Sequence, residues 1–583
     1  MPDDSPRLVI GPVLRRVAGT RATIWVEISR PATVRVEAGS GSGTAPTFCA
    51  YGHHYALVLV DGLTPGTAAP YEVWLDDVKV WPEPDWTYPR SVIRTREAED
   101  GDQPVRLIFG SCRESTQHAS TRKLPPDALD AFARRLMADP PEVRDWPDLI
   151  VLLGDQVYAD ETSPRVRRWL RRRRQRNDAP ADQVVTFHEY TGLYLESWSD
   201  PEIRYLLSTV PSVMIFDDHE VIDDWNTSAS WRADMRAESW WPERITSGLA
   251  SYWIYQHLGN LGPDEIAVDP VYAKVAATED ATAALADFAA GVDQGTSPYQ
   301  WSYALDLGRT RLIVLDNRCS RVLDPAGRAM LPEAEWQWFA DQAHGRYDHL
   351  VVGSSLPWLL PPGVHHLETW NERLTESPRP WVVGVAEKLR RGVDLEHWGA
   401  FRRSFRRMAE LFAELGSGAE RPGITVGVSA GAPASISVLS GDVHHSYVAE
   451  ADLGPGVTSP VHQLTCSPLH NQVPAPMRPV LRLGWGRAMT TATRWLARSA
   501  GLPPAPVRWR RVAGPYFGNA VSTLTHDGRE AEVRIEGTDS DGHLHLVAER
   551  KLTAPDRATG PVPLPRTARA SRKAAAPRPA PPR

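Results

Sequence analysis

Cysteine and lysine are scarce in this sequence. The four cysteines, at positions 49, 112, 319 and 466, lie far apart among 583 residues, which excludes the disulfide framework of a small secreted domain. Arginine supplies 59 of the 65 basic side chains, and the formal net charge is −7. This balance excludes a strongly basic protein dedicated to nucleic acids. Each cysteine is therefore expected to be either buried filler or a metal ligand.

The sequence also lacks a long apolar run and a recognisable leader. Its first residues, MPDDSPRLVIGP, are acidic where a signal peptide is basic, and no apolar core follows them. The uncharged stretch 422–441 contains proline, glycine and four serines, so it is not a membrane span. With 42% apolar and 23% charged residues the composition is globular. We expect a soluble cytoplasmic protein without a membrane span, made of about three or four domain-sized units.

The two ends of the chain differ from its middle. Residues 1–98 contain short alternating runs such as RATIWVEI and HYALVLV between Gly, Pro and Asp turns, which predicts a small all-β sandwich domain of the fibronectin III or immunoglobulin type. Residues 553–583 hold eight prolines and seven basic residues but few apolar ones, so we expect a disordered tail. Residues 104–552 remain for a large catalytic domain.

The central region alternates apolar runs with helical stretches. Each run is four to six residues long and rich in β-branched side chains, as expected of strands buried on both faces. Helices are predicted between them, for example over 126–138 and 333–344, and the pattern indicates an α/β fold. A helix and two or three strands are expected after the last run. The six runs are 105–110, 148–153, 212–216, 310–315, 349–353 and 435–440.

Each of these runs is followed by polar chemistry. The segments are SCRES, GDQVYAD, DDHEVIDDWN, DNRCSR, SSLPW and GDVHHS. The carboxyl ends of strands in an α/β sheet converge at one edge, where ligands bind. So many carboxylates in one cleft would repel one another and protonate unless cations neutralised them. The alternative is that these acids cap helices, which explains one or two loops but not four, so the pattern predicts a metal centre.

The order of the motifs resembles that of a known family. GDxxx after a strand, then DHE, then GDxH is similar to the calcineurin-like metallophosphoesterase superfamily. The cysteine at the end of FGSC is similar to its alkaline phosphatase D (PhoD-like) branch, which has this cysteine in place of the first D-x-H motif. The resemblance covers about 105–550 and implies a four-layer α/β/β/α sandwich preceded by the small β-sandwich.

The resemblance also implies a set of site residues. Asp155 would bridge two metals, and His219 would protonate the leaving group. Arg113 and Arg318 are candidates for binding phosphate oxygens, because a guanidinium matches their geometry, although either can equally form a structural salt bridge. Two or more metal ions are implied, Fe(3+) together with Ca(2+) or another divalent ion such as Mn, Zn or Mg. The implied metal ligands are Cys112, Asp155, Tyr158, Asp218, Asp224, Asp442 and His444.

The chain departs from the family pattern at two points, of which one is the export signal of secreted members, expected to be missing here. Asp223 and Asp224 stand where the family's best-known pattern has two asparagines, which adds up to two negative charges beside the metals. Asp217 is an alternative ligand to Asp218, and His445 is expected to point elsewhere. A cysteine nucleophile would need arginine six positions after Cys112, where the chain has His118.

The function that the resemblance implies is hydrolysis of phosphate monoesters or diesters by a metal-activated hydroxide. Two alternatives stay open from the residues alone. One is a non-catalytic scaffold or polyanion-binding protein with a residual metal site, and the other is a metal hydrolase acting on a different ester. The arginine-rich run 165–176 predicts a helical insertion, either a solvated helix or a phosphate-attracting rim.

Overall fold

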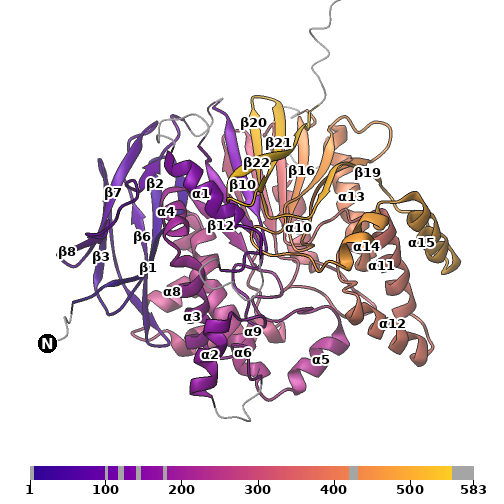
Figure 1. Cartoon of the computed structure of the whole chain (residues 1–583), viewed down its shortest axis with the longest axis horizontal. Helices are drawn as coiled ribbons and strands as arrows, with labels where there is room; N and C mark the ends of the chain where they lie inside the picture. Colours follow the sequence, from indigo (N-terminus) through magenta and orange to yellow (C-terminus); the bar gives the residue numbers. More distant parts are fainter. Residues whose placement is uncertain are drawn as a thin grey trace, which may run out of the picture. The chain divides into compact units, whose positions relative to one another are not determined.

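The computed structural model describes residues 5–98, 101, 103–115, 124–138, 146–174, 180–418 and 431–553. The predicted tail from 554 onward, and the last two residues of the arginine-rich run, lie outside the described residues. Residues Met1–Thr553 cluster as one compact unit. Figure 1 shows this unit from the β-rich N-terminal part to the helices α11–α15.

The N-terminal part is an all-β sandwich, as predicted. One sheet has the order β1-β2-β6-β5 and the other β4-β3-β7-β8, with β9 paired to β7. Ile24, Val36 and Trp81 belong to the core between the two sheets. The strands are β1 Leu8–Ala18, β2 Arg21–Ile28, β3 Thr33–Ala38, β4 Gly41–Pro46, β5 Phe48–Ala50, β6 His53–Val60, β7 Ala68–Leu75, β8 Val78–Trp81 and β9 Val92–Arg94.

The body contains two further sheets. The first has the order β12-β11-β10-β20-β21-β22, with β10, β11 and β12 mutually parallel. Its strands are β10 Val105–Gly110, β11 Leu149–Leu153, β12 Ser212–Ile215, β20 Ala520–Asp527, β21 Glu530–Thr538 and β22 Leu544–Lys551.

The second sheet of the body has the order β13-β14-β15-β16-β18-β17-β19. Four neighbouring strands, β14, β15, β16 and β18, run parallel. Its strands are β13 Tyr303–Leu307, β14 Thr310–Leu315, β15 His349–Ser354, β16 Ser435–Ser440, β17 Ser446–Asp452, β18 Val461–Thr465 and β19 Arg508–Tyr516.

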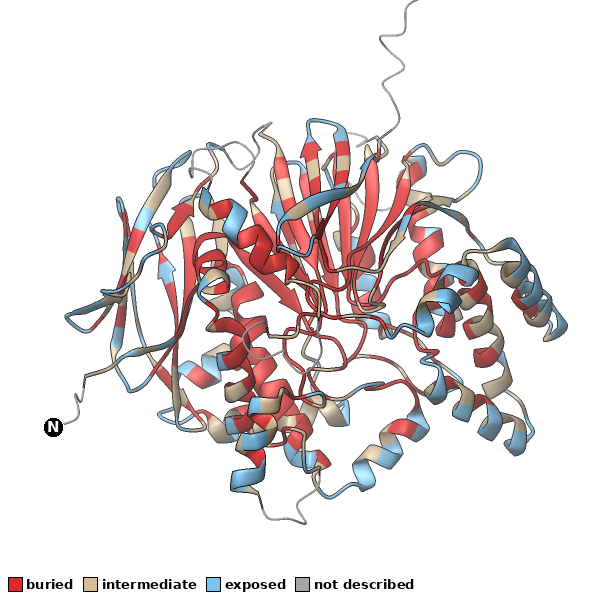
Figure 2. Ribbon diagram, in the orientation of Figure 1, coloured by how far each residue is buried: buried red, intermediate tan, exposed pale blue. Residues whose placement is uncertain are grey.

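Alternating side chains of these strands build a four-layer α/β/β/α sandwich. Leu107 of β10 and Leu312 of β14 point into a core shared by the two sheets. Ile108, the next residue of β10, faces a helical layer that contains α1 Ala128–Ala138, α3 Phe187–Trp198, α4 Pro201–Thr209 and α6 Trp241–Tyr252. Ile313 of β14 faces the layer of α10 Glu333–Gln342 and α13 Arg402–Ser417. Figure 2 shows the sheet strands as the most continuously buried part of the chain.

The remaining helices lie in the connections between these layers. They are α2 Pro164–Arg173, α5 Ala229–Ala237, η1 Trp253–His257, η2 Leu258–Asn260, α7 Pro263–Ile266, α8 Pro270–Ala276, α9 Thr282–Gln294, α11 Pro362–Thr375, α12 Pro380–Gly392, η3 Trp398–Ala400, α14 Met477–Gly484 and α15 Arg487–Ser499.

A buried arginine and a tryptophan are among the residues through which the N-terminal sandwich packs on the body. Arg15 of β1 donates from Nε to the carbonyl of Ser212 (3.1 Å) and from its two terminal nitrogens to the carbonyls of Tyr255 (2.9 Å) and Gln256 (2.6 Å). Trp25 of β2 contacts Tyr255, with ring centroids 5.2 Å apart. Because β2 is covered by the sandwich core on one face and by the body on the other, almost all of its residues are buried.

The six apolar runs are confirmed as strands β10, β11, β12, β14, β15 and β16, and the two helices as α1 and α10. The arginine-rich run begins a helix, α2, which Ser163 caps by accepting from the N–H of Val166. The expected single helix and two or three strands near the end were too few. After the last run the described residues form α14, α15 and six strands, β17 to β22. β17, β18 and β19 belong to the second sheet, and β20, β21 and β22 extend the first.

Candidate metal centre

The ends of strands from both sheets meet at one place. The loop after β10 lies against the loop after β11, since the N–H of Cys112 donates to the carbonyl of Gly154 over 3.2 Å. It also lies against the loop after β16, since the N–H of Asp442 donates to Ser111 Oγ over 3.0 Å. The predicted motifs, which span more than 300 residues of sequence, are therefore neighbours in space.

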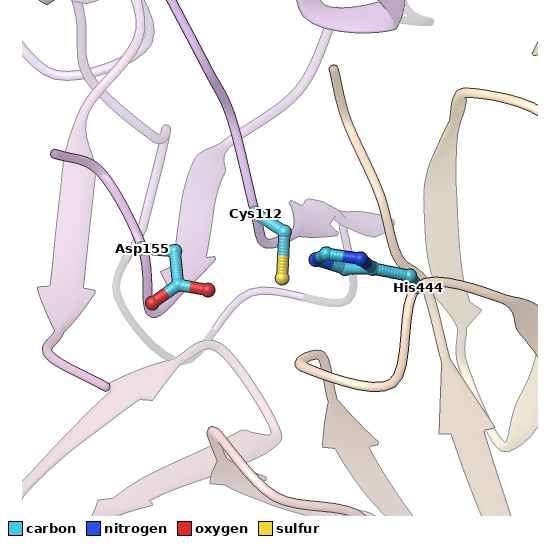
Figure 3. A group of neighbouring side chains, drawn as sticks. All are labelled: Cys112, Asp155 and His444. Carbon is cyan, nitrogen blue, oxygen red and sulfur yellow. The ribbon is translucent and has the colours of Figure 1, made fainter. Parts of the chain in front are cut away.

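Cys112, Asp155 and His444 form the first group of candidate ligands. Their ligand atoms all lie within 4.8 Å of one another. Figure 3 shows the Cys112 sulfur between the Asp155 carboxylate and the His444 ring. Cys112 and Asp155 are buried, and His444 is half-buried. Burial, followed by the charges of Asp155 and Asp442, raises the pKa of the Cys112 thiol well above its usual range. A cation in this group would reverse that effect, because it stabilises the thiolate.

Asp155, Asp218 and His219 form a second group, also within 4.8 Å. His219 Nδ1 lies 2.9 Å from Asp160 Oδ1, so Asp160 orients the imidazole. Burial opposes protonation of this ring, but the carboxylates of Asp160, Asp155 and Asp218 raise the pKa of His219 well above its usual range. These carboxylates therefore favour the protonated form of the ring.

Asp217, Asp218 and Asp442 form a third group. The Arg318 guanidinium lies in it, hydrogen-bonded to Asp217 and to Glu396, 3.3 Å from Asp218 and 3.7 Å from Asp442. Arg318 is fully buried. Arg318 forms ion pairs with these carboxylates, as one of its two predicted roles requires. Its guanidinium neutralises part of the carboxylate charge of the site.

The other predicted residues lie around these groups. The Tyr158 hydroxyl accepts from Asn471 Nδ2 over 3.0 Å, and its ring centroid is 4.8 Å from that of His219. The N–H of Asp224 donates to Asp218 Oδ2 over 2.9 Å. Arg113 is buried and directs its guanidinium to Asp127 Oδ2 (2.8 Å) and to the carbonyl of Ser197 (3.1 Å).

His445 and Asp223 differ from their sequence neighbours in direction and exposure. His445 Nδ1 lies 2.6 Å from the carbonyl of Val443, and the ring stacks on Tyr447 and Phe517. His445 belongs to none of the three groups described above. The Asp223 side chain is 71% exposed, whereas its neighbour Asp224 is half-buried.

Several positioning residues were missed by the sequence analysis. Glu220 is buried and accepts from the backbone N–H groups of Asp155 (3.0 Å), Gln156 (2.8 Å) and Asp217 (2.9 Å), so one carboxylate holds the loops after β11 and β12 together. Its place in the DHE motif was the available signal.

A second missed element is a buried relay to Asp442. His397 Nε2 lies 3.0 Å from Asp442 Oδ2, and His397 Nδ1 lies 2.9 Å from Glu368 Oε1. Burial opposes ionisation of Asp442, but the hydrogen bond and charge of His397 lower its pKa to about 2. His397 and Glu368 lie outside every strand-end motif, and no sequence signal marked them.

The backbone of the site is unusual. Cys112, Asp155, Asp224, Asp442 and His444 all have positive φ, between 45° and 65°. Of the nine non-glycine residues with positive φ in the described part of the chain, five therefore belong to the candidate site. Residues other than glycine, asparagine and aspartate rarely adopt it, and such clusters are typical of functional sites.

The donor set fits metal ions. Asp155 Oδ1, Asp217 Oδ2 and Asp224 Oδ1 are buried and have no hydrogen-bond partner among the described residues. A buried carboxylate oxygen without a partner is costly. A thiol, an imidazole and a phenol beside carboxylates form a mixed set that suits iron together with a harder divalent ion. Cations would therefore satisfy the oxygen atoms that the protein leaves unpaired.

The four-layer sandwich, with its ligand groups at the strand ends, has the architecture of a metallophosphoesterase. The family model described as PhoD-like phosphatase matches residues 135–494, more than half of the chain. The protein therefore belongs to the PhoD-like phosphatase family. The matched range contains all predicted site residues except Cys112 and Arg113, which precede it.

A second family model and one solved structure also match the chain. A family described as a domain of unknown function (DUF7800) matches residues 5–93. A solved structure described as that of PhoD is similar to this chain, with a TM-score of 0.55 and 12% sequence identity. The match covers 96% of this chain and 95% of the solved one. At that identity the likeness shows the fold. No curated protein matched the sequence. In the described part of the chain, no helix is both long and apolar enough to cross a membrane.

Proposed function

We propose that the protein hydrolyses phosphate monoesters and diesters in a metal-dependent reaction. The observation that supports this most directly is the group of Cys112, Asp155 and His444 at adjoining strand ends, beside the orphaned oxygen of Asp155. Membership of a phosphatase family supplies the substrate class.

The residues that would hold metal ions fall into two sets. Cys112, Asp155, Tyr158 and His444 offer one sulfur, two oxygen donors and one nitrogen, a mixed set suited to Fe(3+). Asp155 would be shared with a second set of oxygen donors, Asp218, Asp224 and Asp442, suited to Ca(2+), Mn, Zn or Mg. Metal ions bound there supply Lewis-acid stabilisation of phosphate charge and activation of water.

The chain's own groups have separate tasks. His219, held by Asp160 and charged by its carboxylate neighbours, would donate its proton from Nε2 to the leaving-group oxygen. Arg318 balances Asp217 and Glu396, which limits the net negative charge that an anionic substrate meets. Arg113 would bind a phosphate oxygen only by leaving Asp127, so we propose it as a residue that supports the loop after β10.

The test is Asp155→Asn, with Asp539→Asn as the matched control. Asp539 belongs to an exposed acidic group. We expect Asp155→Asn to lose at least a hundredfold in turnover of p-nitrophenyl phosphate and of bis-p-nitrophenyl phosphate, and to retain less metal by elemental analysis. The control should match the wild type in both measurements.

The same experiment separates the alternatives. Full metal occupancy of the wild type without turnover of either ester would favour a scaffold, and turnover of carboxylic esters alone would favour a different hydrolase. Activity of Asp155→Asn within tenfold of wild type would overturn the bridging role of Asp155.

A further inference from the structure

A groove lined by arginines lies between α15 and β19, apart from the ligand groups. It has a volume of about 800 Å³ and is lined by residues of α15, by the segment 503–507, by β19 and by His366 of α11. Figure 1 shows α14, α15 and α11 next to one another at the end of the molecule that also carries β19. Among the described residues, no acidic side chain lines the groove and six arginines do: Arg487, Arg494, Arg498, Arg508, Arg510 and Arg511.

The arginines of α15 share one face of the helix. Arg487, Arg494 and Arg498, together with Thr491, are spaced by three or four residues, which places them on one stripe. All four side chains line the groove and all are exposed to it. A stripe of like charges on one helix face is unfavourable unless something neutralises it.

Most of this charge has no counter-charge in the protein. Arg510 pairs with Glu450, but Arg487, Arg498 and Arg508 make no ion pair with any carboxylate of the described residues. Arg494 Nε donates to His366 Nε2 over 3.4 Å, which requires that nitrogen to be unprotonated. Burial, followed by Arg494 and Arg498, lowers the pKa of His366 to about 4. Burial and the positive charge of the groove therefore both favour the neutral imidazole.

The neighbouring cavity is a useful contrast. It has a volume of about 410 Å³ and is also lined by arginines, but Glu372 and Glu376 line it too. Arg402 pairs with both glutamates there. Two glutamates therefore offset part of the positive charge of that cavity, whereas no acidic side chain among the described residues lines the groove beside it.

Protection of a sheet edge does not explain the groove. β19 is the last strand of its sheet, and charged side chains on an edge strand prevent pairing with other chains. This reason applies to Arg508 and Arg510, but it does not apply to the arginines of α15, which lie across the groove from the edge.

We propose that this groove binds a polyphosphorylated anion, a ligand with two or more linked phosphate groups. Guanidinium groups pair with phosphate oxygens in a bidentate manner, and the hydroxyls of Thr490 and Thr491 on the same wall can donate as well. A single phosphate would leave most of the six arginines unneutralised, and the volume is that of a site for a small organic ligand. The proposal concerns binding alone and does not require that the groove hydrolyse the bound anion.

The test is calorimetric titration of the full chain with inorganic tripolyphosphate. We expect binding that weakens as ionic strength rises. The double variant Arg494→Gln/Arg498→Gln should weaken binding at least tenfold, and Asp155→Asn should not. The matched control is Arg168→Gln/Arg172→Gln, which removes two exposed arginines at the same spacing from the other arginine-rich helix, α2, and should change affinity less than twofold.

Three results would overturn the proposal. The first is absence of binding by the wild type. The second is an equal loss in the α15 and α2 variants, which would show an effect of net charge alone. The third is binding of a single-stranded oligonucleotide that tripolyphosphate cannot displace, which would assign the groove to nucleic acid. Circular dichroism of each variant establishes that the fold is intact.

Discussion

At the scale of single residues, the site depends on backbone positions that few side chains tolerate. Gly154 has a φ of 102°, and a Cβ there would lie 2.5 Å from the Cβ of Asp217. Its carbonyl accepts from the N–H of Cys112. The loop after β11 can therefore approach both other loops only because residue 154 has no side chain.

Gly154→Ala should destabilise the protein by about 2 kcal/mol or more, because it adds both a steric overlap and an unfavourable φ. The expected effect includes lower metal content, since Asp155 follows directly. Gly192→Ala is the control. Gly192 lies in α3 with open space around its Cα, and alanine there should raise stability by up to about 1 kcal/mol. Thermal melting measures both, and equal melting temperatures of Gly154→Ala and wild type would contradict the argument.

Cys112→Ser distinguishes a ligand from a nucleophile. A thiolate bound to ferric iron gives a visible charge-transfer band, so the serine variant should lose the band and most of its iron while regaining some turnover with added metal. Cys49→Ser, at a half-buried cysteine distant in sequence from every motif, should keep the colour. Absorption spectra with elemental analysis provide the readout. Trapping of labelled phosphate on Cys112 would establish the nucleophile instead.

At the scale of helices and strands, the features that depend on local sequence pattern, such as the strands and the polar loops after them, could be predicted from the sequence. β11 and β16 are buried on both faces. β11 is an unbroken apolar run and β16 alternates serine with Ile, Val and Leu, and each strand is followed two residues later by an aspartate, Asp155 or Asp442. The relay of Glu368 and His397 was not predictable, because α11 and the loop before η3 reach Asp442 only through packing between distant segments. The sequence around Arg318 likewise did not distinguish a residue that binds substrate phosphate from one that forms ion pairs with carboxylates.

The helical segment η1 predicts a dependence of stability on pH. His257 is buried against Trp301, neither ring nitrogen has a hydrogen-bond partner among the described residues, and burial lowers its pKa to about 3. The folded state therefore disfavours the proton that the unfolded chain binds below about pH 6.5. The stability contribution is complete above pH 6.5 and is lost as the pH falls towards 3.

His257→Phe removes this titration. Between pH 7.5 and pH 5, the wild type should lose about 2 kcal/mol more of its free energy of unfolding than the variant loses, as calculated from those two pKa values. Urea denaturation at both pH values measures the difference. Parallel losses in the two proteins would show that His257 does not bind a proton on unfolding in this range.

At the scale of the whole molecule, the N-terminal sandwich and the body share several buried contacts, and those of Arg15 reach furthest towards the site. Arg15 enters the body and hydrogen-bonds to carbonyls of β12 and η1, with Asn260 Oδ1 as a further acceptor at 3.2 Å. Asp217 and Asp218 lie at the other end of β12. The sandwich therefore supports the strand that presents part of the site, and the two should unfold together.

Arg15→Met should cost at least about 3 kcal/mol, since it leaves several buried carbonyls without donors. We expect the single calorimetric transition of the wild type to become two, as the sandwich and the body lose their coupling. Arg7→Met, at an exposed residue at the start of the chain, is the control and should keep one transition. A single unshifted transition for Arg15→Met would show that the other contacts suffice.

The left-handed residues of the site have a consequence for protein engineering. Cys112, Asp155, Asp224, Asp442 and His444 each hold a backbone conformation that glycine would adopt without strain. A search for heat-tolerant variants that ignores activity will therefore favour glycine at these positions. Thermostability and turnover must be selected together in this protein, because a library sorted by melting temperature alone will be enriched in inactive sequences.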